Sequence, residues 1–274
     1  MVSPDPAKLK LGSANVLIVG AGDGNPLYSK NAENVTPIAS ITKLMTAMVV
    51  LDAKQTVDEV LTIDVADMDM LKGSHSRLRL GVELPRKEML RLALMSSENR
   101  AASALCRYYP GGTSACVAAM NAKAAKLGMN HSHFNDPTGL SSDNMSTASD
   151  LVKMVRAASE YPVIREFSTT PAAMVDVPSS SRPVAFKNTN ALVRGGLWDI
   201  QLQKTGFINE AGRCLVMMAN VASQPVVIVL LDSIGRMTRI GDANRIRYWL
   251  ETGESMPVAK VQPHRKRVLV KRRY

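Results

Sequence analysis

Apolar residues along the chain follow two patterns, which separate its ends from its middle. Near the start and in the last third, short apolar runs rich in β-branched residues lie between polar or glycine-rich turns, at 14–19, 200–204, 213–219 and 226–231. Runs of this length predict buried strands. In the middle, longer segments rich in alanine, leucine and methionine predict helices, at 41–51, 89–95, 101–109, 115–127 and 151–159.

Two further stretches complete this pattern. Residues 60–85 predict short strands and turns, and residues 242–251 predict a final helix. Strands at both ends and helices between them predict an α/β fold, in which both chain ends form an antiparallel sheet flanked by helices. We expect one domain over 1–256, with an α/β lobe at about 12–60 and 185–253 and an inserted, mainly helical lobe at about 61–184.

A glycine-rich segment, 20–26, follows the first predicted strand. Glycines in this place are typical of dinucleotide sites when a helix opens directly after them. Here residues 26–29 continue as another strand. The segment therefore predicts a hairpin turn and no cofactor site.

Composition indicates a globular protein, with 46% hydrophobic and 21% charged residues among 274. The net charge is +10, but seven basic residues and no acid follow Met256, so 257–274 is a basic tail. The remaining chain is nearly neutral, which argues against a nucleic-acid partner. A solvated tail is the favoured interpretation, and weak contact with an anionic surface is the alternative. The sequence holds no apolar run long enough for a transmembrane segment.

The cysteines and histidines suggest no metal chemistry. Three cysteines cannot all pair within the chain, and buried free thiols are the favoured interpretation. A disulfide between Cys106 and Cys116 in an oxidising compartment stays open. His131 and His133 are the only close histidine pair, with no clear third ligand, so no metal or cofactor is expected.

Three short motifs carry the candidate chemistry: Ser40-Ile41-Thr42-Lys43, Ser97-Glu98-Asn99 and Lys204-Thr205-Gly206. Each motif alone is weak, but together in this order they predict one active site for acyl transfer through a serine ester.

Ser40 and Lys43 lie three residues apart at a predicted helix start, so their side chains share one face. A serine hydroxyl needs a base to remove its proton. Lys43 can act as that base only when neutral, so its pKa must fall by roughly 3 units from about 10.4. Burial and the second cation, Lys204, would both lower it.

The other motif residues suit the rest of such a reaction. Ser97 can pass a proton between the lysines and a leaving amine, and the Asn99 amide can bind substrate or orient Lys43. Lys204 and Thr205 can hold a substrate carboxylate by charge-assisted hydrogen bonds.

Backbone groups complete the predicted site. Gly206 allows a close approach of the substrate to the strand. We assign the oxyanion hole to the backbone N–H groups of Ser40 and Phe207.

Around these motifs, at 37–48, 94–102, 119–124, 137–141 and 202–207, the chain resembles the low-molecular-mass penicillin-binding proteins, which are serine D-alanyl-D-alanine peptidases. Within them it is most similar to the endopeptidase subgroup, the penicillin-binding protein seven type, over about 13–253. The resemblance implies the transpeptidase fold, peptidoglycan stem peptides as substrates and β-lactam antibiotics as covalent inhibitors. It also implies a periplasmic enzyme made with a signal peptide, which the printed sequence does not show.

The resemblance also assigns roles to the motif residues. It implies Ser40 as the acylated nucleophile with Lys43 as its base, and Ser97 and Asn99 as the second catalytic element. It implies Lys204 and Thr205 as substrate binders.

Three alternatives stay open. A class A β-lactamase needs a glutamate for deacylation, in a Glu-x-x-Leu-Asn segment. Glu160 and Glu166 are the only glutamates between Asn99 and Lys204, and neither has those neighbours. A DD-carboxypeptidase that removes terminal D-alanine, and a non-catalytic penicillin-sensing or wall-binding module, are the other two. The preference for an endopeptidase rests on the subgroup likeness.

Overall fold

The computed structural model describes residues 4–20, 25–177 and 182–256. Its main sheet is antiparallel, with the strand order β2-β1-β11-β10-β9. Its strands are β1 (Ser13–Gly20), β2 (Pro26–Lys30), β9 (Asp199–Ile208), β10 (Gly212–Val221) and β11 (Gln224–Ser233). Both ends of the chain therefore build this sheet, and β9 lies at one of its edges.

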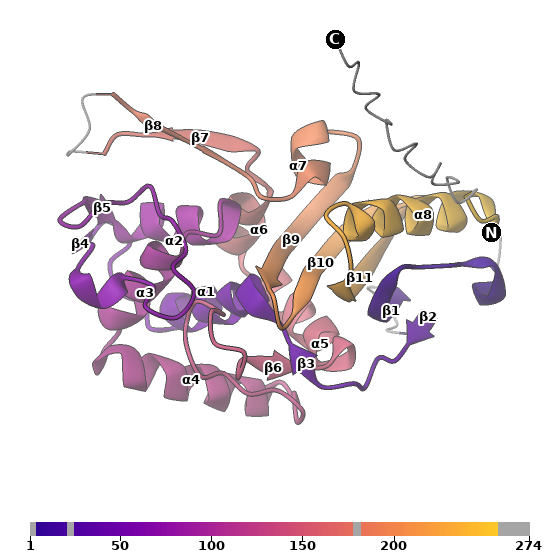
Figure 1. Cartoon of the computed structure of the whole chain (residues 1–274), viewed down its shortest axis with the longest axis horizontal. Helices are drawn as coiled ribbons and strands as arrows, with labels where there is room; N and C mark the ends of the chain where they lie inside the picture. Colours follow the sequence, from indigo (N-terminus) through magenta and orange to yellow (C-terminus); the bar gives the residue numbers. More distant parts are fainter. Residues whose placement is uncertain (1–3, 21–24, 178–181, 257–274) are drawn as a thin grey trace, which may run out of the picture.

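Helices, short strand pairs and connecting loops make up the rest of the described chain (Figure 1). The α-helices are α1 (Lys43–Asp52), α2 (Arg86–Met95), α3 (Asn99–Arg107), α4 (Gly112–Lys126), α5 (Ala148–Ser159), α6 (Pro162–Thr169), α7 (Ala191–Gly195) and α8 (Thr238–Thr252). The 3-10 turns are η1 (Pro6–Lys8), η2 (Ala39–Thr42) and η3 (Val65–Asp67). The short antiparallel pairs are β3 (Thr36–Pro37) with β6 (Met145–Ser146), β4 (Val60–Thr62) with β5 (Glu83–Pro85), and β7 (Ala172–Val175) with β8 (Val184–Lys187).

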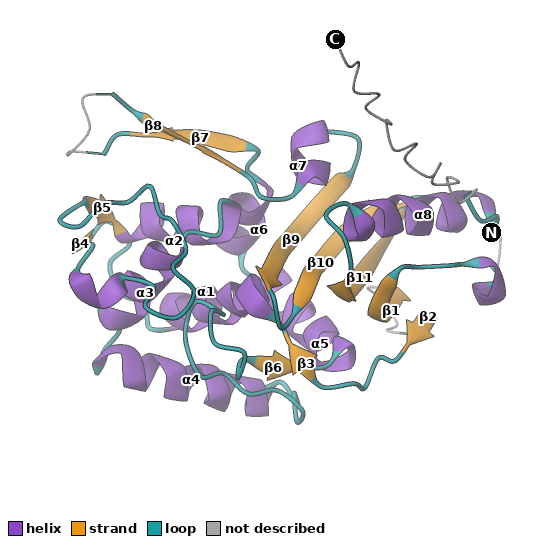
Figure 2. Cartoon of the chain, in the orientation of Figure 1, coloured by secondary structure: helices purple, strands orange, loops and turns teal. Residues whose placement is uncertain are grey.

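The sheet is covered on both faces, by α8 on one side and by the helices around α5 on the other (Figure 2). Alternate residues of β11 show this directly. Ile228 packs in the cluster that contains Trp249 of α8, whereas Val227 and Val229 pack in the larger cluster of the helical side. Strands buried on both faces carry apolar residues at successive positions, which explains the continuous apolar runs of the sequence.

The expected α/β architecture, an antiparallel sheet made by both chain ends and flanked by helices, is confirmed. β1 and β2 pair as the two strands of a hairpin, although turn residues 21–24 lie outside the described residues. The sequence patterns missed α6, the β7–β8 hairpin and α7, which are short or only half buried. The division into two lobes stays a prediction, and the basic tail lies outside the described residues.

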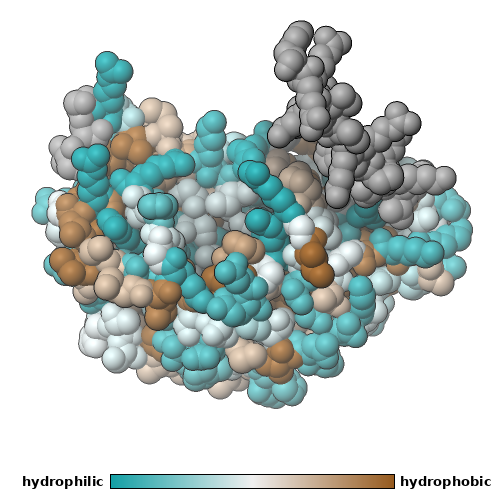
Figure 3. All heavy atoms as spheres, in the orientation of Figure 1, coloured by the Kyte–Doolittle hydropathy of each residue, from teal (hydrophilic) through white to brown (hydrophobic). Residues whose placement is uncertain are grey.

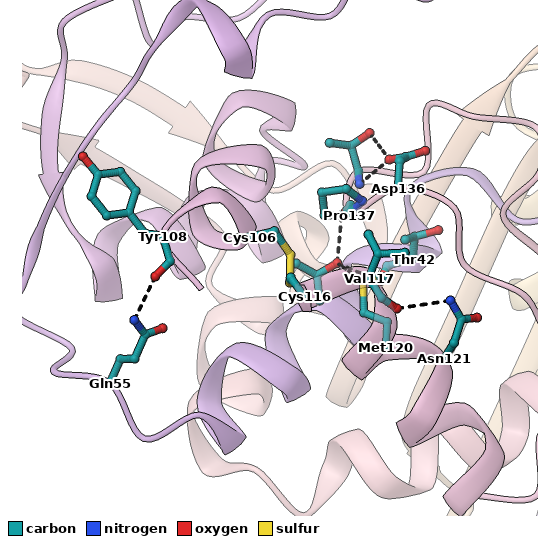
Figure 4. Close-up of a disulfide and its surroundings, with 12 residues drawn as sticks. Thr42, Gln55, Cys106, Tyr108, Cys116, Val117, Met120, Asn121, Asp136 and Pro137 are labelled. Carbon is teal, nitrogen blue, oxygen red and sulfur yellow. Dashed lines mark hydrogen bonds between the residues drawn. A yellow bond between two sulfur atoms is a disulfide. The ribbon is translucent and has the colours of Figure 1, made fainter. Parts of the chain in front are cut away.

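The expectation of free thiols at Cys106 and Cys116 is wrong. These residues form a disulfide that joins the end of α3 to the start of α4 (Figure 4). The tight turn between the two helices contains Gly111 at φ 85°. It brings the Cα atoms of Cys106 and Cys116 to 5.4 Å from each other, a normal distance for a disulfide. Cys214 is free and buried, as expected.

The surface carries no extended apolar belt on the face in Figure 3, which is mainly hydrophilic with apolar atoms in small scattered groups. Within residues 4–20, 25–177 and 182–256, no helix has both the length and the apolar character needed to cross a membrane.

Candidate active site

Ser40 lies in the 3-10 turn η2, directly before α1, and not in the first turn of the α-helix as the sequence predicted. Lys43 is the first residue of α1, and its Nζ lies 2.9 Å from Ser40 Oγ. The short turn followed by the helix start keeps the two side chains on one face, so the predicted pair forms. A nucleophile and a base within hydrogen-bond reach are the minimum that serine acylation requires.

Lys43 is almost completely buried, with 1% of its surface exposed. Its Nζ donates to Ser40 Oγ, to Asn99 Oδ1 at 2.7 Å and to the Thr138 carbonyl at 2.6 Å. These acceptors match the three donors of an ammonium group. The nitrogen is therefore held in one place, beside the serine that it would deprotonate.

Burial lowers the pKa of Lys43 to about 7, because the charged form loses its water. The carboxylates of Asp136, Glu98 and Asp69 act in the opposite direction and raise it. At neutral pH a large share of Lys43 is therefore unprotonated. This is the protonation state that a general base needs.

A second lysine and serine form a similar pair. Lys204 Nζ donates to Ser97 Oγ at 2.8 Å and to the Thr205 carbonyl at 2.9 Å. Lys204 is fully buried, and burial lowers its pKa well below the ordinary value, helped by the positive charges of Lys43 and Arg239. Ser97 itself has φ 62°, an uncommon left-handed conformation for serine, which aims its hydroxyl from the turn between α2 and α3.

Asn99 links the two sides of the site. Its Oδ1 accepts from Lys43, and its Nδ2 donates to Ser74 Oγ at 2.8 Å. The backbone N–H of Ser74 in turn donates to Asp69 at 2.8 Å. These contacts fix which end of the amide faces Lys43, so the Asn99 oxygen is directed at the lysine.

A loop that received no role in the sequence analysis supports the nucleophile. Asp136 accepts from the backbone N–H groups of Gly139 and Ser141, both at 2.8 Å, and so folds the loop. Gly139 has φ 79°, and a Cβ there would lie 2.0 Å from the carbonyl oxygen of Ala39, next to Ser40. The Asp-Pro-Thr-Gly composition of this loop signals a turn. Nothing in it signals that the Thr138 carbonyl accepts a hydrogen bond from Lys43.

These residues surround a pocket of about 440 Å³. Six of the predicted site residues line it: Ser40, Ser97, Asn99, Thr205, Gly206 and Phe207. The pocket walls also include Lys72, Ser74, Leu140, Thr189, Ile208, Asn209 and Arg239. Lys43 and Lys204 do not line it and are buried, so Lys204 would affect a bound carboxylate through Ser97 and Thr205.

Strand β9 closes one side of the pocket. Gly206 passes so near the nucleophile turn that a Cβ would lie 2.8 Å from the Ile38 carbonyl and 3.2 Å from the Ser40 nitrogen. Next to it, the Thr205 hydroxyl lies 2.6 Å from that of Thr189. The third motif therefore needs glycine at position 206 because the backbone of β9 packs directly against the backbone of the turn that carries Ser40.

Arg239, at the start of α8, is a site residue that the sequence analysis missed. Its guanidinium donates to the Gly206 carbonyl at 2.8 Å and lines the pocket. It adds a positive charge beside Thr205, where the sequence placed an anionic group of the substrate. No motif marks it, because it comes from a helix more than thirty residues after Lys204.

No carboxylate lines the pocket as far as the described residues define it. Glu160 and Glu166 are exposed at the end of α5 and on α6. Glu98 is buried beside Ser97, but its oxygens accept from Ser76 Oγ at 2.6 Å and from the Arg77 nitrogen at 3.3 Å. A carboxylate poised to activate water at an ester on Ser40 is therefore not part of this pocket.

Comparison with known proteins agrees with this geometry. Residues 2–235 match the family described as D-alanyl-D-alanine carboxypeptidase. The chain is 49% identical over 249 residues to a D-alanyl-D-alanine endopeptidase of Pseudomonas aeruginosa and to one of Escherichia coli, covering 91% of this chain and 80% of each relative. A crystal structure of a Streptomyces DD-transpeptidase superposes with a TM-score of 0.82 and 28% identity, over 89% of this chain and 98% of that one. The resemblance and the transpeptidase fold inferred from the sequence are confirmed.

Proposed function

The chain belongs to the D-alanyl-D-alanine carboxypeptidase family and is a serine-type D-alanyl-D-alanine peptidase; from this premise we propose that it cleaves D-alanyl cross-links of peptidoglycan as a DD-endopeptidase. The observation that carries the mechanism is the buried Lys43, whose Nζ lies 2.9 Å from Ser40 Oγ.

In acylation, Ser40 Oγ attacks the carbonyl carbon of the D-alanyl peptide bond and gives its proton to Lys43. The negative charge on the carbonyl oxygen is held by the backbone N–H groups of Ser40 and Phe207. When the peptide C–N bond breaks, the proton that Lys43 took from Ser40 passes to the leaving amine by way of Ser97, and Lys43 is neutral again. Water then hydrolyses the ester on Ser40 and restores the free hydroxyl.

The exposed edge of β9 supports an extended substrate. Among the described strands, β9 pairs in the main sheet only with β10, so a peptide strand can lie along its other side. Thr205 and Arg239 line the pocket beside this edge and provide donors for an anionic group of the substrate. Lys204 is buried outside the pocket lining and supports binding of this anionic group through its hydrogen bond to Ser97.

The same site fits β-lactams as covalent inhibitors. A β-lactam presents a strained amide carbonyl to Ser40 and forms an ester in the same way as the peptide. Because the described pocket has no carboxylate lining, nothing in it resembles the deacylation base of a class A β-lactamase. We therefore expect the β-lactam ester to persist, and the enzyme to be inhibited by β-lactams and not to degrade them.

The choice of endopeptidase over carboxypeptidase rests on the 49% identity to two proteins with that name. The family description favours a carboxypeptidase as the second candidate. The test is digestion of purified cross-linked muropeptide dimers and of monomeric pentapeptide muropeptides, followed by chromatography, with Ser40→Ala as the control. Loss of dimers with little loss of terminal D-alanine is expected, whereas release of D-alanine with intact dimers would make the protein a carboxypeptidase.

We also infer a periplasmic location. The Cys106–Cys116 disulfide is buried, and such bonds are typical of oxidising compartments and rare in the cytosol. An enzyme that acts on peptidoglycan must also lie on the periplasmic side of the membrane.

A further inference from the structure

The pocket is bridged near the end of β9 by an ion pair that the catalytic mechanism does not use. Lys72 lies on the loop that also carries Ser74, on the Asn99 side of the pocket. Glu210 does not line the pocket itself but lies in the turn between β9 and β10, directly after Asn209, which lines the β9 side. Lys72 Nζ and Glu210 Oε1 are 2.5 Å apart, so the pair connects the Lys72 wall to the turn that follows β9.

The loop that carries Lys72 is firmly held, so the movable part of this bridge is the side chain. Asp69 accepts from the backbone N–H groups of Leu71 at 2.8 Å, Lys72 at 2.9 Å and Ser74 at 2.8 Å. The Ser74 end of this loop is attached to the active site, because Asn99 Nδ2 donates to Ser74 Oγ. The position of the Lys72 backbone is thus defined by the same loop that orients the amide beside Lys43.

The two charges of the bridge are exposed to solvent. The Lys72 side chain is 32% exposed and that of Glu210 is 43% exposed. Lys72 lowers the pKa of the Glu210 carboxyl through their hydrogen bond, so this carboxylate stays charged at neutral pH. Exposed pairs of this kind are weak and are screened by salt, so this one can open at little cost.

A peptide that lies along β9 beyond Phe207 must pass this bridge, since Ile208 and Asn209 line the pocket there together with Lys72. A small ligand that fills only the space around Ser40, Ser97 and Thr205 need not disturb it. We propose that Lys72 and Glu210 form a clasp that determines substrate specificity, and that the clasp must open to admit a long or branched peptide. This proposal rests on the proposed function, because it assumes that the substrate lies along β9.

The test compares two β-lactams that acylate the same serine. One is benzylpenicillin, and the other is a penicillin whose acylamino group carries a peptide of stem-peptide length. The measured quantity is the ratio of their second-order acylation constants, followed by intact-mass spectrometry. The variants are Lys72→Met, Glu210→Gln and the double variant, with Asp58→Asn combined with Lys87→Met as the control, because those residues form an exposed ion pair at 2.5 Å outside the pocket.

The clasp predicts that each single variant raises the ratio of peptidyl-penicillin to benzylpenicillin acylation by about 1.4- to 5-fold, the range for an exposed ion pair. The double variant should show no further gain, because the two single variants and the double variant all lose the same ion pair between Lys72 and Glu210. High salt should raise the ratio of the wild type and of the charge-pair control, which both keep the Lys72–Glu210 pair, toward that of the clasp variants, and should leave the clasp variants without comparable gain.

An unchanged or lower ratio in the single variants contradicts the clasp, and so do gains that add in the double variant. Absence of an adduct with either β-lactam contradicts the proposed function instead. The two failures are therefore distinguishable in one set of measurements.

Discussion

Two lysine–serine pairs lie at the same pocket, and they are built in different ways. Lys43 and Ser40 are three residues apart and meet through a local turn, at 2.9 Å. Lys204 and Ser97 are 107 residues apart and meet at 2.8 Å only because β9 packs beside the turn between α2 and α3. Both lysines are buried, so burial alone does not distinguish them.

The charges around the two lysines differ in sign. Carboxylates of Asp136, Glu98 and Asp69 partly offset the effect of burial on the pKa of Lys43, which stays near neutrality. Around Lys204 the neighbouring charges are positive and lower its pKa further. The comparison suggests two roles: Lys43 exchanges a proton with Ser40 near pH 7, and Lys204 responds to the arrival of an anionic substrate.

Replacing each lysine by arginine should separate the two proposed roles most clearly. Lys43→Arg should lower the acylation constant for benzylpenicillin by about 10³-fold, because a guanidinium group does not give up its proton to become a base. Lys204→Arg places a permanent positive charge beside Ser97, the charge that an anionic substrate would favour on Lys204, and should lower the acylation constant by about tenfold. Circular dichroism checks that both variants fold, and equal losses for the two would contradict the division of roles.

Among the described contacts, the loop that carries Thr138 and Gly139 touches the Lys43–Ser40 pair and not the Lys204–Ser97 pair, which gives a second test. Gly139→Ala combines a positive φ with a clash against the Ala39 carbonyl, whereas Gly128→Ala has a similar φ and no atom within 4 Å. Gly139→Ala should lower the free energy of unfolding by about 3 kcal/mol or more and the acylation constant by about 100-fold. Gly128→Ala should cost about 1–2 kcal/mol in urea unfolding and leave acylation of the folded protein unchanged. Similar losses of activity in both would show that the Gly139 loop does not hold Ser40.

Much of this comparison could be predicted from the sequence, but not all of it. The apolar runs predicted the strands because the sheet is buried on both faces. The three motifs named the residues of both lysine–serine pairs, but only the contact between Ser40 and Lys43 was itself predicted. The pattern could not reveal the Thr138 carbonyl, since any residue has a carbonyl and only the loop fold aims it at Lys43. Arg239 and Ser74 were missed because they reach the pocket from segments without a motif. The disulfide depended on a turn geometry that spacing alone does not define.

Glu98 offers a smaller test of the charge difference. Glu98→Gln removes a carboxylate that raises the pKa of Lys43, so that pKa should fall further. More of the lysine is then neutral below pH 7, and acylation at pH 6 should become about two- to threefold faster, with little change at pH 8. Glu88→Gln is the matched control, because Glu88 pairs with Arg91 on α2. A slower rate at pH 6 for Glu98→Gln would contradict the assigned sign.

The disulfide should affect stability and leave the lysine–serine pairs intact. Cys106→Ala combined with Cys116→Ala opens a bond with a sequence separation of 10 residues, and should lower the free energy of unfolding by about 3 kcal/mol. Acylation at a temperature where the variant is folded should equal that of the wild type. A loss of acylation in the folded variant would mean that the bond positions Asn99 through α3.

The central claim is that neutral Lys43 activates Ser40, and the pH dependence of acylation tests it most directly. The second-order constant for benzylpenicillin would be measured from pH 5 to 9, with the adduct located on Ser40 by peptide mass spectrometry. With a Lys43 pKa of about 7, the constant should rise about tenfold per pH unit below pH 6 and become level above pH 8. A constant that does not change between pH 5 and 8, or that keeps rising to pH 9, would contradict the account.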